Sequence, residues 1–311
     1  MSRDAGSRST NDLQKRLEQR NVRKTIVAHL TSELELGPPV EPELPPSILK
    51  HSSGPPSQQT HILPTSNPGD SPLEAPPMSV SEQEAVQLEP LYYESTRDLE
   101  EVFREMHPWF EGKEEEHNWL RREKSILKLR RITKGNAPEE YPGPFYSGIK
   151  SLLDGILKTV NSLRTTVCTI GCHLVQDLAR VCGPSLDNMV EIMLQSLIKL
   201  CGNTKKISAT KANDTVSAIL TNVTYHVRLV QHIHNACQDK NVQPRTFACG
   251  WLKIIITKHG HHGSPIDHAG GLDLIEKCIK SGLADSNPSV REKMRSTYWA
   301  FARVRWEKSE T

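Results

Sequence analysis

Paired helical segments recur along the C-terminal part of this 311-residue chain, and this recurrence limits the possible folds more than any other feature. From residue 146 to residue 305 the apolar residues follow helical spacing, and no stretch alternates as a strand would. A new pair begins about every 40 residues, which is typical of helical repeats. A two-helix unit of that length cannot bury its apolar face alone, so successive units must stack. The sequence therefore predicts an all-α solenoid.

Start and stop signals divide the solenoid into five helix pairs. Ser95 is a candidate N-cap with Asp98 three residues later, and Pro244 and Pro288 suit first helical turns. A proline-rich connection over residues 138–144 separates the first pair from the second. The expected helices cover residues 95–108 and 118–133, 146–160 and 162–182, 186–200 and 207–221, 225–237 and 244–258, and 271–283 and 288–305. Pairs of this length are typical of HEAT and armadillo repeats.

The first 90 residues have a different composition. Residues 38–90 hold 13 of the 21 prolines, so this stretch buries too little apolar surface to offset the entropy cost of ordering it. We expect residues 1–90 to be a disordered linker that packs on nothing, followed by the repeat domain over 91–306 and a tail over 307–311. Residues 11–30 show helical spacing and are either a docking segment or, as we favour, a nascent helix, because short isolated helices are marginal in water.

Targeting and cysteine patterns narrow the class of protein. The polar start, MSRDAGSRST, and the lack of any apolar span of ~18 residues predict neither a signal peptide nor a membrane segment. The seven cysteines lack paired C-x-x-C spacing and mostly fall on apolar helix faces. This favours buried thiols in an intracellular protein over a zinc site or a disulfide frame. The net charge of +2 gives no electrostatic case for nucleic acid.

Catalytic and metal-binding patterns are weak. His232 and His234 are two residues apart on a helix and so point to different faces. A second histidine group, between residues 259 and 268, lies in a glycine-rich connection with Asp267 as its nearby carboxylate. The chain has no phosphate-binding glycine loop and no Ser/His/Asp signature. We therefore expect a non-enzymatic binding protein with no metal and no cofactor.

The turns inside the helix pairs are short, polar and cationic. They fall at residues 160–164, 202–206, 239–245 and 285–291, and each contains at least one Lys or Arg. Equivalent turns of a solenoid line up along one edge, to which Trp119 and its neighbouring arginines would add a first member. This pattern predicts a basic edge headed by one aromatic, suited to an acidic protein surface or a polyanion. The alternative is that these cations only keep the protein soluble.

Several sequence blocks resemble the TOG domain of the CLASP family, the cytoplasmic linker-associated proteins that regulate microtubules. The similarity covers residues 91–306. The blocks occur in order: FEGK at 110–113, NW at 118–119, REK at 122–124, SLRTT at 162–166, LAD at 283–285, PSVR at 288–291 and YWAF at 298–301. The resemblance implies a flat paddle of HEAT repeats whose intra-repeat turns bind tubulin through an aromatic on the first turn and basic residues on the others.

Carried over residue by residue, the resemblance implies tubulin-binding roles for nine side chains. Trp119 would pack on one tubulin subunit, and Ser162 would line the second turn. Seven cations would face the acidic surface of tubulin: Arg122, Arg164, Lys205, Lys206, Lys240, Arg245 and Arg291.

The resemblance also implies a cellular role. We expect a protein that stabilises microtubules and promotes rescue in the spindle during cell division, located on cytoplasmic microtubules and in the nucleus during mitosis, and recruited by plus-end or kinetochore proteins. The alternative is a HEAT-repeat adaptor for other acidic proteins or for nucleic acid. A single exposed aromatic argues against RNA, because single-strand binding uses several stacking aromatics.

The chain departs from the family pattern in length. TOG domains have six repeats, whereas five pairs are found here, with neither a second TOG domain nor the basic, serine-rich lattice-binding region. These differences indicate a truncated product. They also predict that the last helix leaves four apolar residues with no following repeat to cover them: Val290, Met294, Phe301 and Ala302.

Overall fold

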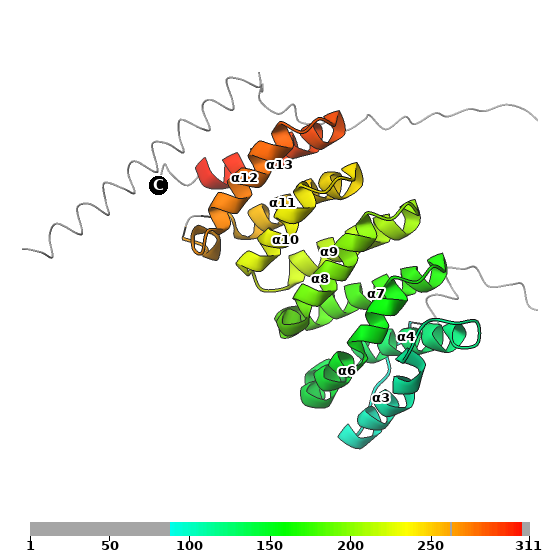
Figure 1. Ribbon diagram of the computed structural model, residues 1–311. Coiled ribbons are helices and arrows are strands. Elements are labelled where there is room, and N and C mark those ends of the chain that lie inside the picture. Colours follow the sequence, from blue (N-terminus) through cyan, green and yellow to red (C-terminus); the bar gives the residue numbers. More distant parts are fainter. Residues whose placement is uncertain (1–87, 262, 307–311) are drawn as a thin grey trace, which may run out of the picture. The chain divides into compact units, whose positions relative to one another are not determined.

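The computed structural model describes residues 88–261 and 263–306 (Figure 1). Residues 1–87 of the linker expected over 1–90, the expected helix at 11–30 and the expected tail at 307–311 lie outside the described residues. Within the described ranges every regular element is a helix, which confirms the prediction of an all-α repeat fold. None of these helices has the length and apolar character needed to span a membrane.

Five long helix pairs account for most of the described chain. They are α3 (Thr96–Phe110) with α4 (Trp119–Lys134), α6 (Pro142–Val160) with α7 (Thr165–Cys182), α8 (Asp187–Cys201) with α9 (Lys206–Asn222), α10 (Val227–Cys237) with α11 (Val242–His259), and α12 (Gly271–Leu283) with α13 (Pro288–Trp306). Three short elements that were not predicted lie between pairs: α5 (Ala137–Glu140), η1 (Gly183–Leu186) and η2 (Pro265–Asp267).

The pairs stack in two layers. The first helices of successive pairs contact one another in the order α3, α6, α8, α10, α12, and the second helices do so in the order α4, α7, α9, α11, α13. Figure 1 shows this succession from the cyan α3 to the red end of α13. Each repeat thus covers the apolar face of the one before it, as expected for a solenoid.

The core lies between the two layers and follows the helical spacing of the apolar residues. On α6, for example, Ile149, Leu152 and Ile156 fall on one face and are almost fully buried. All seven cysteines are buried and free, as their positions on apolar faces predicted. A buried ion pair between Arg130 Nε and Asp177 Oδ2, at 2.7 Å, joins α4 to α7 inside this core.

Two helix boundaries differ from the prediction for reasons that lie in packing and proline chemistry. Helix α3 does not stop at Pro108 but runs on to Phe110, which is only 4% exposed, so tertiary packing holds the last turn despite the proline. Helix α6 begins at Pro142 instead of residue 146. Proline lacks a backbone N–H, but the first helical positions do not need one, so prolines here start the helix.

A short extended segment before α3 lies against the end of α4. The backbone N–H of Leu91 donates to the carbonyl of Arg131 at 3.0 Å, and Arg131 Nε donates to the carbonyl of Glu89 at 2.8 Å. The N–H of Tyr93 donates to the side-chain oxygen of Asn136 at 2.9 Å. The expectation that residues up to 90 pack on nothing is therefore wrong at Glu89.

The last helix is better covered than the sequence suggested. Val290, Met294, Phe301 and Ala302 are all buried, with exposed fractions of 1%, 0%, 9% and 4%. Helix α13 packs on α11 and α12, so these side chains pack against the preceding repeat. The prediction of an uncovered apolar face on this helix is wrong, because α13 packs on α12 of its own repeat and on α11 of the preceding one.

Candidate interaction surface at the repeat turns

The five turns inside the helix pairs form the candidate surface, which we call the turn edge. They are turn 1 (residues 111–118), turn 2 (161–164), turn 3 (202–205), turn 4 (238–241) and turn 5 (284–287), defined as the residues between paired helices. Figure 1 shows these turns following one another along one side of the stack. The conformation of each turn determines where its side chains lie on this edge.

Four of the turns use the same local chemistry to start the second helix. A side-chain oxygen accepts a hydrogen bond from the backbone N–H two residues later, which favours a turn over continued helix. The accepting residues are Ser162, Asn203, Asn241 and Asn287, at donor–acceptor distances of 3.1, 3.0, 3.0 and 2.9 Å. Turn 1 is longer, and there the side chain of Asn118 accepts from the N–H of Glu115 at 2.9 Å.

Polar contacts link each turn to the next. Between turns 1 and 2, Arg164 pairs with Glu114 and Glu116. Between turns 2 and 3, Lys205 Nζ donates to the carbonyl of Leu163 at 2.6 Å. The other two links are Asn241 Nδ2 to the carbonyl of Gly202, at 3.1 Å, and the ion pair of Arg245 with Asp285. The five turns therefore form a single connected row.

Arg122 has a structural place in turn 1. Its side chain is 0% exposed, and its guanidinium donates to the carbonyls of Trp109, Glu111 and Lys113 at 2.8, 2.7 and 3.0 Å. Burial lowers the pKa of Arg122, although nearby glutamates oppose the shift. The expected surface position of Arg122 is therefore wrong: this cation holds the turn from inside.

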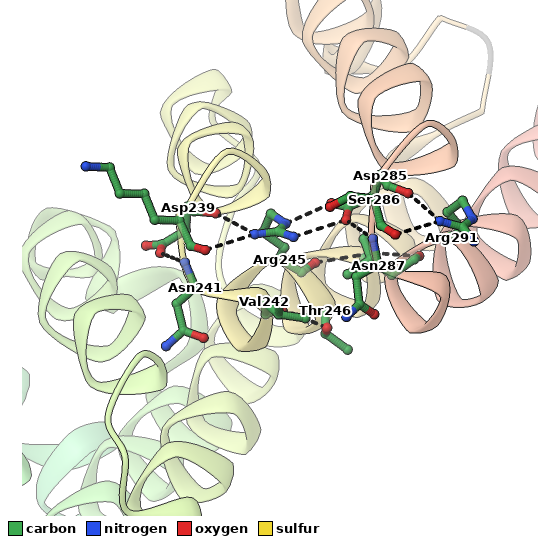
Figure 2. Close-up of polar contacts among 12 residues, drawn as sticks. Asp239, Asn241, Val242, Arg245, Thr246, Asp285, Ser286, Asn287 and Arg291 are labelled. Atoms are coloured by element: carbon green, nitrogen blue, oxygen red, sulfur yellow. Dashed lines mark hydrogen bonds and ion pairs between the residues drawn. The ribbon is translucent and has the colours of Figure 1, made fainter.

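Arg245 and Arg291 act in the same way on turns 4 and 5 (Figure 2). Arg245 Nη1 donates to the carbonyls of Asp239 and Lys240, while its other nitrogens pair with Asp285 at 2.8 and 3.1 Å. The hydrogen bond between them raises the pKa of Arg245 and lowers that of Asp285. Arg291 Nη1 donates to the carbonyls of Asp285 and Ser286. Much of the bonding capacity of both arginines is thus used within the protein.

Trp119, Ser162 and Arg164 lie together where turns 1 and 2 meet. The guanidinium carbon of Arg164 lies 5.1 Å from the centre of the Trp119 ring, within the range of a cation–π contact. Ser162 Oγ and Arg164 Nη1 both donate to the same oxygen of Glu114, each at 2.9 Å. The structure therefore gathers three predicted site residues around an acid that the sequence analysis did not select.

The remaining predicted cations are Lys205 in turn 3, Lys206 at the start of α9 and Lys240 in turn 4. Lys205, Lys206 and Lys240 are all exposed. No ion pair is found for Lys206 or Lys240 among the residues that the structure describes, whereas Lys205 also reaches the neighbouring turn. Of the seven predicted cations, these three lysines are therefore the ones most exposed to solvent.

Exposed apolar side chains on the same edge were missed by sequence reasoning. Leu163 in turn 2 is 79% exposed and Ile207, at the start of α9, is 61% exposed. Leu120 and Val242, at the starts of α4 and α11, are exposed to 46% and 37%. Apolar residues within or next to a polar turn were the available signal. Together with the lysines they make the edge a mixed apolar and cationic surface, as protein-binding surfaces often are.

The architecture defines the chain as a helical-repeat protein with a continuous edge of turns. Comparison with known proteins gives the family. The sequence pattern of the family described as CLASP N terminal matches residues 99–311. The chain belongs to this family.

The chain is also similar to individual curated proteins and to a solved structure. Protein STU1 of Coccidioides immitis is 59% identical over 238 residues, which are 76% of this chain and 19% of that protein. Protein stu1 of Aspergillus fumigatus is 56% identical over 232 residues, 75% of this chain and 17% of that protein. The TOG domain of Zyg9 from C. elegans aligns with a TM-score of 0.49 and 14% identity, over 72% of this chain and 84% of that one. The chain spans about a fifth of the length of the two curated relatives.

Proposed function

We propose that the chain is a tubulin-binding module that docks on tubulin or the microtubule lattice through the turn edge. Membership of the CLASP N-terminal family supports a microtubule-associated role, because CLASP proteins are regulators of microtubules. The observation that carries the proposal is the connected row of turns, which presents Trp119, exposed leucine and isoleucine side chains and exposed lysines on one side. A row of small contacts at fixed spacing suits a large, flat partner such as tubulin.

The mixed character of the edge suits an acidic protein. Lys206 and Lys240 supply positive charge without an ion pair among the described residues, and Leu163 and Ile207 supply area that loses water on contact. Arg122 has no part in direct contact, and Arg245 and Arg291 set the shape of their turns. The proposed contact residues are therefore Trp119, Ser162, Leu163, Arg164, Lys205, Lys206, Ile207 and Lys240.

The cellular role is part of the same proposal. A protein that binds tubulin through this edge would stabilise microtubules, promote rescue and act in the spindle during cell division. Its location would be the cytoplasmic microtubules and, during mitosis, the nucleus, with plus-end or kinetochore proteins recruiting it.

The test is co-sedimentation of the full 311-residue chain with microtubules, and gel filtration of the chain with unpolymerised tubulin. Trp119→Ala should weaken binding by about 2 kcal/mol, as is typical for an interface aromatic. Trp299→Ala is the matched control, because this half-exposed tryptophan lies in the body of α13, away from the turns. Equal binding by both variants and the wild type, with unchanged circular dichroism, would rule out Trp119 as a contact.

The adaptor alternative predicts a different outcome in the same assay. A HEAT-repeat adaptor for nucleic acid or another acidic protein would not sediment with microtubules, and a nucleic-acid binder would shift a single-stranded RNA probe. The turn edge offers Trp119 as a stacking aromatic, and this ring is half-buried beside Arg164, whereas the exposed apolar residues of the edge are aliphatic. Because single-strand binding depends on successive stacked bases, this composition favours a protein partner.

A further inference from the structure

Glu114 is the point at which the two turns nearest Trp119 meet. One of its carboxylate oxygens accepts from both Ser162 Oγ and Arg164 Nη1, each at 2.9 Å. Its side chain is only 14% exposed. Glu116 reaches the other end of the same guanidinium, Arg164 Nη2, at 2.6 Å, from a side chain that is 87% exposed. The buried acid and the solvent-facing acid therefore hold the guanidinium of Arg164 from two sides.

The charge of Glu114 also acts toward the inside of turn 1. Its second oxygen is buried and makes no hydrogen bond to any described residue, and the same is true of Arg122 Nη1. The negative charge of Glu114 stabilises the cationic form of Arg122. Arg122 in turn donates to the carbonyls of turn 1. Glu114 thus supplies negative charge to two arginines: Arg122, which stabilises turn 1, and Arg164, the last residue of turn 2.

The orientation of Arg164 determines what Trp119 can present. An arginine side chain has several rotatable bonds, and holding it in one place costs conformational entropy unless partners fix it. Glu114 and Glu116 fix it with its guanidinium 5.1 Å from the Trp119 ring centre, so the ring has a packed neighbour on that side. A fixed ring loses less entropy when a partner covers it.

We propose that Glu114 is a positioning residue for tubulin binding, holding Ser162 and Arg164, and through Arg164 also Trp119, in the arrangement that docks. This inference rests on the proposed function. It assigns a binding role to an acid on an edge whose partner is acidic, so two physical effects oppose each other. Simple electrostatics says that removing a negative charge here should tighten binding to an acidic surface. Positioning says that it should weaken binding, because the arginine and the ring lose their fixed geometry.

The decisive comparison is Glu114→Gln against Glu115→Gln in the full chain. Both variants remove one negative charge from adjacent positions, but Glu115 is exposed and its side chain pairs with His117, without a link to turn 2. Microtubule co-sedimentation should show roughly fivefold weaker binding for Glu114→Gln, since a charge-assisted pair is lost. Glu115→Gln should bind as well as the wild type or slightly better. Equal affinities for the two variants would overturn the proposal.

A second comparison, of Glu116→Gln with Glu115→Gln, tests the proposal even if Glu114→Gln does not fold. Glu116→Gln changes a side chain that is mostly in solvent, so the fold should be untouched, yet it removes the second partner of Arg164. It should weaken binding relative to Glu115→Gln, by less than Glu114→Gln does. If Glu116→Gln matches Glu115→Gln while Glu114→Gln is unfolded by circular dichroism, Glu114 is only a structural residue and the proposal fails.

A double-mutant cycle separates positioning from direct contact. If Glu114 acts through Arg164, Glu114→Gln should cost little in an Arg164→Gln background, because the group it holds is already gone. Additive losses would show that Glu114 acts independently of Arg164 and would overturn its role in positioning that side chain. Failure of the wild type itself to bind microtubules or tubulin would overturn the proposed function along with this inference, which keeps the two failures distinguishable.

Discussion

In three of the five turns an arginine lies four residues after the asparagine that ends the turn and precedes the second helix. Arg122 follows Asn118, and Arg245 and Arg291 follow Asn241 and Asn287 in the same way. One helical turn is 3.6 residues, so a side chain at this spacing lies beneath the turn that precedes it. Each of the three donates to main-chain carbonyls of that turn, which the ending helix leaves without intrahelical donors.

The most buried of these arginines should matter most for stability. Arg122→Gln removes the donors of several carbonyls in a fully buried place, so the free energy of unfolding should fall by about 3 kcal/mol. Arg121→Gln is the control, because Arg121 is exposed and its guanidinium only lies 4.4 Å from the Trp109 ring centre. Urea unfolding followed by circular dichroism measures both. If Arg122→Gln lowers the free energy of unfolding by as little as Arg121→Gln does, Arg122 does not stabilise turn 1 in this way.

At the residue scale, the sequence predicted which arginines lie at the turns better than it predicted which way their side chains point. It placed Arg122, Arg245 and Arg291 on or next to turns, because turn chemistry is local and can be read from Asn, Asp, Ser and Pro. Whether an arginine points out or folds back depends on acceptors supplied by other segments, such as Asp285 for Arg245. Glu114 was missed for the same reason: it lies in an acidic run, and its partners are 48 and 50 residues away.

Among the elements, α3 and α6 show how close packing selects residues where the first and second repeats meet. Gly148 and Gly155 are seven residues apart and so lie on one face of α6. A Cβ atom at Gly148 would lie 2.4 Å from Phe103, and one at Gly155 would lie 2.3 Å from the Cβ of Phe110. Two phenylalanines of α3 thus occupy the places that side chains of α6 would need, which brings the helices close together.

Opposite outcomes are expected for two glycine-to-alanine changes inside helices. Gly155→Ala forces α3 away from α6 and should lower the free energy of unfolding by about 2 kcal/mol, as overpacking typically does. Gly250→Ala adds a methyl where no atom lies within 4 Å. It should raise stability by up to about 1 kcal/mol, because alanine is the better helix former. Thermal unfolding of the two variants measures both signs, and stabilisation by Gly155→Ala would contradict the contact.

The elements themselves were largely predictable, since five helix pairs follow from apolar spacing and from caps such as Ser95. The differences arose where tertiary packing overrides a local signal, as at Pro108. The short extended segment at Glu89 and Leu91 carries no periodic pattern. Its place depends on acceptors and donors of α4, including Arg131, and on Gly135, where a Cβ would lie 1.7 Å from the carbonyl oxygen of Leu91.

For the whole molecule, the cations of the turn edge fall into two groups: those bound to other groups of the protein and those that face solvent. Arg122, Arg245 and Arg291 are committed to internal acceptors, and Arg164 is paired with two acids. Lys206, which begins α9 beside turn 3, and Lys240 in turn 4 are exposed and have no ion pair among the described residues, so they carry most of the edge's field toward an approaching partner. Long-range attraction of this type speeds association and weakens as salt screens it, over a Debye length of about 8 Å near physiological ionic strength.

The final prediction concerns this field. Lys206→Glu with Lys240→Glu should slow association with microtubules and flatten its salt dependence, since steering depends on summed charge near the contact. Lys150→Glu with Lys277→Glu is the matched control: both lysines are exposed in the bodies of α6 and α12, and either double reversal changes the net charge from +2 to −2. Association rates across a salt series measure the effect. If both double variants lose the same fraction of the rate, net charge alone steers the encounter, and the lysines of turns 3 and 4 have no special place in it.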